Sequence, residues 1–316
     1  MKELFLGEYI RQERLKKGIT QEQLCEGICD LITVSRMENG KQMPSYNRIR
    51  AFLQRLGLPD KRFFALLSKN EREIKTLQDE IRADCIRFER AAPEDRPHIR
   101  TAGLEKLERL EQLAEPDDRI VRQYIMAERA TLGKPDGPYS PEERLNLLLE
   151  ALRITVPNLD LEEINLGLYS MEETTLLNQI AVAYVRMGQE KKAIDIYRQL
   201  LKYVQKRYCD GMSRYAGKFA LMAHNYTRTL FAVRRYDDAL EVAELGRKVC
   251  VEYAHYQFLP GLLDLMGGCY FYQGDLDKCK EYYRDAHCLY RIIGDDHNRL
   301  LLEKEAKERL GLEFPF

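Results

Sequence analysis

The side chains between positions 21 and 41 carry most of the recognisable chemistry of this 316-residue chain. Arg36 has a planar fork of donors that matches the acceptor pair of guanine, and Thr33 has a hydroxyl and a methyl group that suit thymine. With Ser35, they stand close together on one short predicted helix. This pattern favours a helix that reads base edges in a DNA major groove. An ion pair with Glu38 or with a neighbouring helix is the alternative for Arg36.

Three further polar residues flank that helix and predict contacts with the sugar-phosphate backbone. Gln21 begins the preceding helix, where its side chain and backbone N–H can reach a phosphate. Asn39 and Lys41 follow the reading helix and are expected to hold the DNA backbone on its other side. A capping contact within the protein is the alternative for Gln21. The predicted DNA-binding set is therefore Gln21, Thr33, Ser35, Arg36, Asn39 and Lys41.

Five short helices are predicted to position these side chains. Apolar residues at helical spacing predict the first over residues 4–17. Thr20, with Gln23 three residues later, is a capping-box signal for the second helix, and Asp30 is the predicted cap of the third. The fourth and fifth helices are predicted to open at Pro44-Ser45 and at Leu58-Pro59-Asp60.

The third helix, predicted over residues 31–38 with Val34 and Met37 as its buried face, has an unusual start. Leu31 and Ile32 stand where such helices usually carry polar, base-reading side chains. We expect them to press on thymine methyl groups, to pack on a partner domain, or to weaken specificity.

A second set of candidate ligand-binding residues lies in the C-terminal half. Asn178 and Asn225 each carry a donor and an acceptor, which can hold the backbone amides of an extended peptide. Arg186 and Arg228 suit a carboxylate, and aromatic residues suit side-chain pockets. The alternative is that these residues are solvated or make internal contacts. The predicted peptide-binding set is Asn178, Arg186, His224, Asn225, Arg228, Asp264 and Phe271.

Pairs of antiparallel helices are predicted to present this second set on a concave face. Three stretches place small residues at recurring positions, with anchors at Ala193, Ala239 and Cys279, and aromatic residues between them. The anchors are 46 and 40 residues apart, above the usual spacing of about 34, so longer helices or turns are expected. This pattern resembles the tetratricopeptide repeat, and residues 297–312 are predicted as its polar terminal cap.

An amphipathic helix over residues 68–92 is predicted to connect the two parts. Its apolar positions include Ile74, Leu77 and Ile81, and Ala92-Pro93 ends it. A dimer seam and packing on the repeat domain are the two interpretations of its apolar face.

Charge is distributed unevenly along the chain. Residues 1–70 hold 13 Lys and Arg against 8 Asp and Glu, a net charge of +5, and the remainder holds 37 against 43, a net charge of −6. A basic N-terminal part fits a DNA contact. The absence of an apolar run of about 18 residues and of a secretory signal predicts a cytoplasmic protein without a membrane partner.

Cysteine and histidine patterns argue against metal chemistry and catalysis. The eight cysteines form no Cys-x-x-Cys pair and no zinc-finger spacing with a histidine. We expect them to be small buried residues, with a redox switch as the alternative. The five histidines show no nucleophile-and-base pattern. No enzyme activity, cofactor or metal is therefore predicted.

Two segments carry a resemblance to a known family. The stretch Gln21-x-Gln-Leu-x-Glu-x-Ile-Cys29, followed by Val34-Ser-Arg-Met-Glu38, resembles the helix-turn-helix of phage repressors and, more closely, of the PlcR-type peptide-pheromone regulators of Gram-positive bacteria. These belong to the Rgg–Rap–NprR–PlcR–PrgX grouping. The resemblance implies a homodimer on an inverted-repeat operator in double-stranded DNA. It also implies a short, re-imported signalling peptide in the groove that changes the spacing of the two heads.

The predicted fold is therefore all-α, with an N-terminal five-helix helix-turn-helix domain followed by a tetratricopeptide-like α-solenoid. We predict a DNA-binding domain over 1–67, a connector over 68–92, and an effector-binding and dimerisation domain over 93–316. The predicted function is peptide-controlled transcription regulation of the quorum-sensing type. The alternative is a regulator or adaptor whose repeat domain binds a protein partner or another ligand. The operator, the effector, the sign of regulation and the dimer helices stay open.

Overall fold

The computed structural model describes residues 6–58, 68–207 and 212–314. Apart from an isolated bridge between Lys134 and Gly137, the regular elements in these ranges are helices, which confirms the all-α prediction. None of the described helices is long and apolar enough to cross a lipid bilayer. The chain divides into two compact units, residues 1–187 and 188–316.

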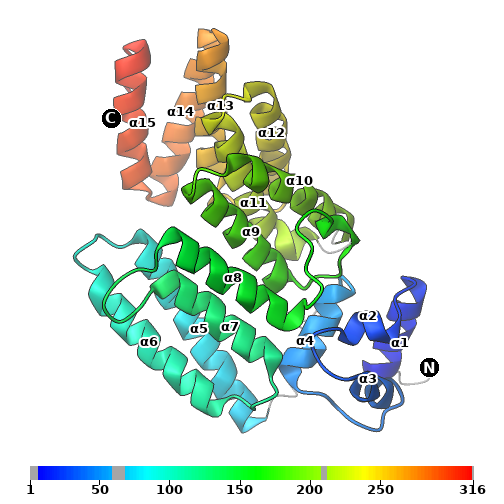
Figure 1. Cartoon of the computed structure of the whole chain (residues 1–316). Helices are drawn as coiled ribbons and strands as arrows, with labels where there is room; N and C mark the ends of the chain where they lie inside the picture. The colour runs from blue at the N-terminus through cyan, green and yellow to red at the C-terminus, as the bar shows by residue number, and fades with distance from the viewer. Residues whose placement is uncertain (1–5, 59–67, 208–211, 315–316) are drawn as a thin grey trace. The chain divides into compact units, whose positions relative to one another are not determined.

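The first unit begins with a cluster of short helices, here called the head (residues 6–58), drawn in blue in Figure 1. Its core is built from fully buried apolar side chains of all four described helices, among them Ile10, Leu24, Val34 and Phe52. The predicted fifth helix falls largely on residues 59–67, outside the described residues. The described helices of the head are α1 (Leu6–Lys16), α2 (Gln21–Cys25), α3 (Leu31–Glu38) and α4 (Tyr46–Arg55).

Local hydrogen bonds set the starts of α2 and α3 as the sequence predicts. Thr20 and Gln23 form a reciprocal capping box, in which Thr20 Oγ1 accepts from the Gln23 N–H at 3.1 Å and Gln23 Oε1 accepts from the Thr20 N–H at 2.8 Å. Asp30 Oδ1 accepts from the Thr33 N–H at 2.6 Å and caps α3. Val34 and Met37 are buried, as predicted.

The rest of the first unit consists of longer helices that pack side by side (Figure 1). The buried face of α5, with Ile74, Leu77 and Ile81, packs into one apolar cluster with residues of α6 and α7. Of the two interpretations of the connector, the structure therefore supports packing on the neighbouring helices. These elements are α5 (Lys69–Arg90), α6 (Arg96–Leu113), α7 (Arg119–Leu132), α8 (Pro141–Thr155), the 3-10 turn η2 (Ile164–Leu166) and α9 (Met171–Arg186).

The second unit is a succession of helices in which each of α11 to α15 packs on the one before it. The predicted anchors Ala193, Ala239 and Cys279 are fully buried, which confirms the small-residue pattern. The last helix buries Leu302 and Ala306 and exposes many charged residues, as expected of a terminal cap, but Leu300 and Leu301 are also exposed, so its outer face is only partly polar. The helices are α10 (Glu190–Arg207), α11 (Met212–Ala232), α12 (Tyr236–Glu252), α13 (Leu259–Gln273), α14 (Leu276–Ile293) and α15 (Asp296–Leu310).

The cysteines agree only in part with the prediction of small buried residues. The described cysteines are free thiols, and Cys25, Cys85 and Cys250 are among the buried ones. Cys288, on α14, is exposed and departs from the prediction. Cys209 lies outside the described residues.

Candidate DNA-binding and effector surfaces

The exposed face of α3 carries two parallel rows of side chains four residues apart. One row holds Leu31, Ser35 and Asn39, and the other holds Ile32 and Arg36. Leu31 is 41 % exposed and Ile32 is 60 % exposed, while Arg36 and Asn39 are also exposed. Most of the predicted reading residues therefore share one accessible face of one helix.

Thr33 is the exception among the predicted reading residues. It is only 9 % exposed and lies on the inward face beside Val34 and Met37. Thr33 stands one turn before the buried Met37, and the bond between Arg14 and Glu38 holds this face of α3 against the core. Thr33, predicted as a base-reading residue, is therefore turned away from the exposed face of α3.

A buried carboxylate holds α3 from behind. Glu38 accepts two hydrogen bonds from the Arg14 guanidinium, at 2.6 and 2.9 Å, and one from the Gln21 side-chain amide at 2.7 Å. Arg14 also donates to the carbonyl of Ile19 at 2.8 Å. These bonds join α1, α2 and α3 through charged groups removed from water. Glu38 thus pairs with Arg14. The side-chain amide of Gln21 donates to the same carboxylate and does not make the capping contact that was the alternative for this residue.

The residues that follow α3 stay at its exposed end. The Asn39 amide donates to the Ser35 carbonyl at 2.8 Å, which ends the helix. Lys41 is exposed, and its backbone N–H donates to the Arg36 carbonyl at 2.8 Å. Lys41 therefore stands directly beyond the reading face, where the sequence places it.

A buried arginine attaches the head to α8 and α9. Arg55 donates to the Leu24 and Glu26 carbonyls of the head, to the Thr155 carbonyl at 3.0 Å, and to Glu173 Oε1 at 3.1 Å. The side chains of Arg55 and Glu173 are only 2 % and 3 % exposed. The Thr155 hydroxyl donates to the same carboxylate oxygen at 2.6 Å. We call this group of Arg55, Thr155 and Glu173 the head latch.

Beside the head latch, the backbone at Gly27 lies directly against the backbone at Thr155. Gly27 has φ +69°, and a Cβ built there would lie 2.0 Å from the carbonyl oxygen of Thr155. The turn between α2 and α3 therefore meets the end of α8 without room for any side chain.

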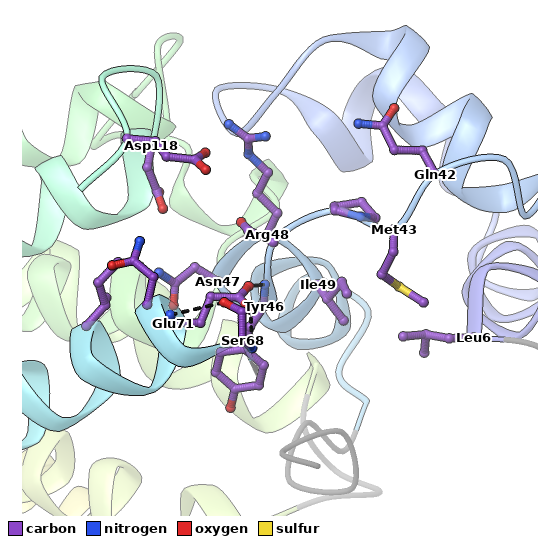
Figure 2. Close-up of a pocket in the computed structure, with 15 residues that line it drawn as sticks. Leu6, Gln42, Met43, Tyr46, Asn47, Arg48, Ile49, Ser68, Glu71 and Asp118 are labelled. Carbon is purple, nitrogen blue, oxygen red and sulfur yellow. Dashed lines mark hydrogen bonds between the residues drawn. The ribbon is translucent and has the colours of Figure 1, made fainter. Parts of the chain in front are cut away.

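A cavity of about 530 Å³ marks a second attachment, between α4, the start of α5 and the turn before α7 (Figure 2). Arg48 reaches from α4 to Asp117, 2.8 Å away. Glu71 accepts from the backbone N–H groups of Tyr46, at 2.7 Å, and Ser68, at 2.9 Å. The start of α5 and the turn before α7 thus both hold α4 in place.

The predicted peptide-binding residues are divided between the two units. Asn178 and Arg186 lie on α9 of the first unit, whereas His224, Asn225 and Arg228 lie on α11 and Asp264 and Phe271 on α13 of the second. Asn178 and Asn225 are buried, and Arg186 and Arg228 are exposed.

In the first unit, Arg186 has a second guanidinium in its neighbourhood. Burial and the positive charge of Arg186 together lower the pKa of Arg144 on α8. Two neighbouring cations of this kind favour an anionic ligand. Arg144 was not among the predicted residues, although it lies one helix before Arg186.

In the second unit, α11 and α13 approach closely at two glycines. A Cβ at Gly261 would lie 2.8 Å from His224 Nε2, and one at Gly268 would lie 3.0 Å from the ring of Phe231. Both pairs are seven residues apart on their helices, so they stand on matching faces. Burial and the charge of Arg228 lower the pKa of His224 to about 4. His224 is therefore a neutral side chain packed between helices at neutral pH.

Aromatic rings gather at the far end of the same two helices. The rings of Tyr236 and Tyr272 stack at 5.1 Å, and the Phe231 ring lies 5.8 Å from that of Tyr272. The Arg309 guanidinium of α15 stands over Phe271 and Tyr272, 5.2 and 5.3 Å from the ring centroids. Phe271 thus belongs to an aromatic surface, which is the kind of surface predicted to hold a side chain of a bound peptide.

Asp264 lies on α13 near Glu305 of α15. Burial, reinforced by the negative charge of Glu305, raises its pKa to about 7. The Tyr290 hydroxyl lies 3.5 Å from Asp264 Oδ2. This carboxyl therefore takes up a proton at a much higher pH than an exposed aspartate does.

Comparisons with known proteins bear on both surfaces. A model of the RNPP family C-terminal domain matches residues 144–309, and a model of a helix-turn-helix domain matches residues 6–63. The first match covers more than half of the chain. The chain belongs to the RNPP family. This confirms the family predicted from the sequence and the helix-turn-helix nature of the head.

The solved structures of PlcR have the same fold along nearly the whole RNPP chain. PlcR from Bacillus thuringiensis, in complex with the peptide PapR7 and DNA, is 20 % identical with a TM-score of 0.56, covering 94 % of this chain and 98 % of that one. The apo form of PlcR is also 20 % identical, with a TM-score of 0.55, and the match covers 94 % of this chain and 97 % of that one. A variant of the Streptococcus dysgalactiae pheromone receptor Rgg2 is 16 % identical, with a TM-score of 0.49, and the match covers 96 % of this chain and 99 % of that one. No protein of curated function matches the sequence.

Sequence reasoning missed the charged residues that hold the head of this RNPP chain together. Arg14 and Glu38 are 24 positions apart, and Arg55 and Glu173 are 118 positions apart. A signal existed for Glu38, which belongs to the motif shared with repressor heads. No local pattern marks Arg55, because its partners come from distant helices.

Proposed function

We propose that this RNPP chain is a transcription regulator of the cytoplasm that binds operator DNA through α3 and is controlled by a short signalling peptide. One observation carries the proposal: α3 is fixed from behind by the buried Glu38 and presents Ser35, Arg36 and Asn39 on one exposed face. A short helix held in this way can enter a major groove and set side chains against base edges.

The ligands of PlcR, which has the same fold, support the two halves of the proposal. That protein is described in complex with a peptide and with DNA. We assign the same two ligand classes to this chain, with DNA on the head and the peptide on the repeat helices.

Effector contacts are proposed for each unit separately, on α9 in the first unit and on α11 and α13 in the second. Asn178 and Asn225 are assigned to the peptide backbone, since an amide side chain can donate and accept at once. Arg186, with Arg144 nearby, is assigned to a carboxylate. The aromatic surface around Phe271 is assigned to an apolar side chain of the peptide.

Two copies of the chain are proposed to bind one operator. A head this small reads only a few base pairs, and a two-fold dimer doubles the recognised sequence. The operator is then an inverted repeat whose half-site spacing reports the distance between the two reading helices.

Selection of binding sites from random duplex DNA, with the full-length protein, tests the proposal. We expect an enriched inverted repeat. Arg36→Ala should then weaken operator binding by about 1–3 kcal/mol and relax specificity at one position of each half-site. Arg284→Ala, an exposed arginine on α14, is the matched control and should bind normally. A folded protein that enriches no duplex would contradict DNA binding, and normal binding by the Arg36 variant would remove that residue from the site.

A further inference from the structure

The first turn of α3 exposes two large aliphatic side chains. Leu31 and Ile32 are 41 % and 60 % exposed, whereas the apolar residues one turn further, Val34 and Met37, are buried. In the described part of the head, Leu15 and Met43 are the other large apolar residues with comparable exposure. Leu31 and Ile32 therefore contribute little to the core, and their exposure calls for another reason.

The surrounding contacts prevent these two side chains from turning inward. Asp30 fixes the start of α3 by accepting from the Thr33 N–H, and Glu38 fixes its end through Arg14 and Gln21. Any rotation of α3 that buried Ile32 would break this charged network and expose Val34. The outward direction of Leu31 and Ile32 is thus built into the packing of the head.

Ile32 shares its row on α3 with Arg36. Four residues of α-helix rise about 6 Å, and one base pair of DNA rises about 3.4 Å, so the two side chains reach positions about one or two base pairs apart. Thymine is the base that presents a methyl group in the major groove. An aliphatic side chain in that groove gains most by covering such a methyl group.

We infer that Ile32, with Leu31 beside it, is a specificity-determining contact for thymine C5-methyl groups in the operator. The assignment rests on the proposed binding of DNA by α3. It adds that each half-site carries a thymine about one or two base pairs from the base pair that Arg36 reads. The apolar start of α3 then selects sequence through methyl burial instead of hydrogen bonding.

The charge around the two residues favours DNA over a protein partner. Arg36 and Lys41 lie on or directly beyond the same exposed face, and residues 1–70 carry a net charge of +5. The nearby carboxylate of Asp30 is committed to the helix cap, which lowers its pKa. A surface that combines aliphatic and cationic side chains matches a groove bordered by phosphates and lined by thymine methyl groups.

Replacement of single thymines by deoxyuridine tests the inference. Deoxyuridine keeps every hydrogen-bonding group of thymine and lacks the methyl group. The selected operator is synthesised with each thymine replaced in turn, and binding of the full-length protein is measured by fluorescence anisotropy. We expect one replacement in each half-site to weaken binding about 4-fold, the effect of one buried methyl group.

The same duplexes are then measured with Ile32→Ala, which should bind the thymine operator more weakly and lose the sensitivity to that replacement. Ile32→Val should keep part of the sensitivity. Ile292→Ala, at an isoleucine 72 % exposed on α14, is the matched control and should behave as the wild type. Unchanged melting temperatures show that each variant is folded.

Two results would overturn the inference while leaving DNA binding in place. One is an operator on which no deoxyuridine replacement weakens wild-type binding. The other is an Ile32→Ala variant that keeps the full wild-type sensitivity, or binds the operator more tightly. Failure to enrich any duplex would overturn the proposed function, and this assignment with it.

Discussion

Asn225 is buried on α11, next to a histidine that burial keeps neutral. We expect Asn225→Ala to weaken effector binding at least 10-fold, since a buried amide that holds a peptide backbone leaves unpaired groups on the ligand when it is removed. The measurement is the melting shift of the full-length protein on addition of synthetic peptides encoded by small open reading frames beside its gene. Asn146→Ala, an exposed asparagine on α8, is the control. A full melting shift with the Asn225 variant would place the peptide elsewhere.

The carboxyl of Asp264 makes stability depend on pH. Burial raises its pKa from 3.8 to about 7, so the folded state binds its proton more tightly than the unfolded state. Its contribution to stability is therefore greatest below about pH 4 and is lost as the pH rises toward about 7. We expect Asp264→Asn to stabilise the protein at pH 8 by about 1–2 kcal/mol and to change little at pH 4.

Urea denaturation at the two pH values checks this prediction. Asp285→Asn, an exposed carboxyl on α14, should change stability at neither pH. Equal effects of Asp264→Asn at pH 4 and pH 8 would show that the carboxyl titrates normally.

At the scale of elements, the head latch determines how α4 is held against α8 and α9. Arg55→Ala leaves the Glu173 carboxylate buried without its cation, and we expect a loss of about 3–5 kcal/mol in urea denaturation. The pair of Arg50 and Glu172, 2.6 Å apart and with both side chains 23 % exposed, is the matched comparison. Arg50→Ala should cost about 0–1 kcal/mol. Similar losses in the free energy of unfolding for both variants would mean that burial does not make the ion pair of the head latch more important for stability than the Arg50 pair.

The turn between α2 and α3 allows a cleaner test of the same contact. Gly27 and Gly18 have nearly the same φ, +69° and +66°, but a Cβ at Gly18 would meet nothing within 4 Å. Gly18→Ala should therefore cost only the backbone strain of about 1–2 kcal/mol. Gly27→Ala adds an overlap with the Thr155 carbonyl and should cost clearly more. Thermal unfolding of the two variants gives the comparison, and equal losses would show that the head does not rest on α8 in solution.

At the scale of the whole molecule, charge separation along the sequence predicts how operator binding responds to salt. Residues 1–70 have a net charge of +5 and the remainder a net charge of −6. We expect the operator affinity to fall steeply between low and physiological salt, because phosphate contacts release counterions. Lys41→Ala should reduce the slope of log affinity against log salt by about 1. Lys304→Ala, on α15, should leave the slope unchanged, and an unchanged slope for Lys41→Ala would remove Lys41 from the phosphate contacts.

Features that depend on near neighbours could be predicted from local sequence patterns. The caps at Thr20 and Asp30 and the buried anchors at Ala193 and Cys279 follow from residue type and spacing. The same local patterns identified the family, because a helix-turn-helix motif and a repeat of helix pairs can both be recognised from residues that are close together in the sequence. Helix starts and buried faces need no information from distant residues.

Which charged groups are buried, and which way each reading residue points, depends on contacts between residues that are far apart in the sequence. Thr33 turns inward because α3 is held by Arg14 and Glu38. Arg55 meets Glu173 across 118 residues of sequence, and no local pattern distinguishes that arginine from a solvated one. The physical reason is that the free energy of a buried ion pair depends on the geometry and desolvation of both partners. Folding sets both quantities, and sequence spacing sets neither.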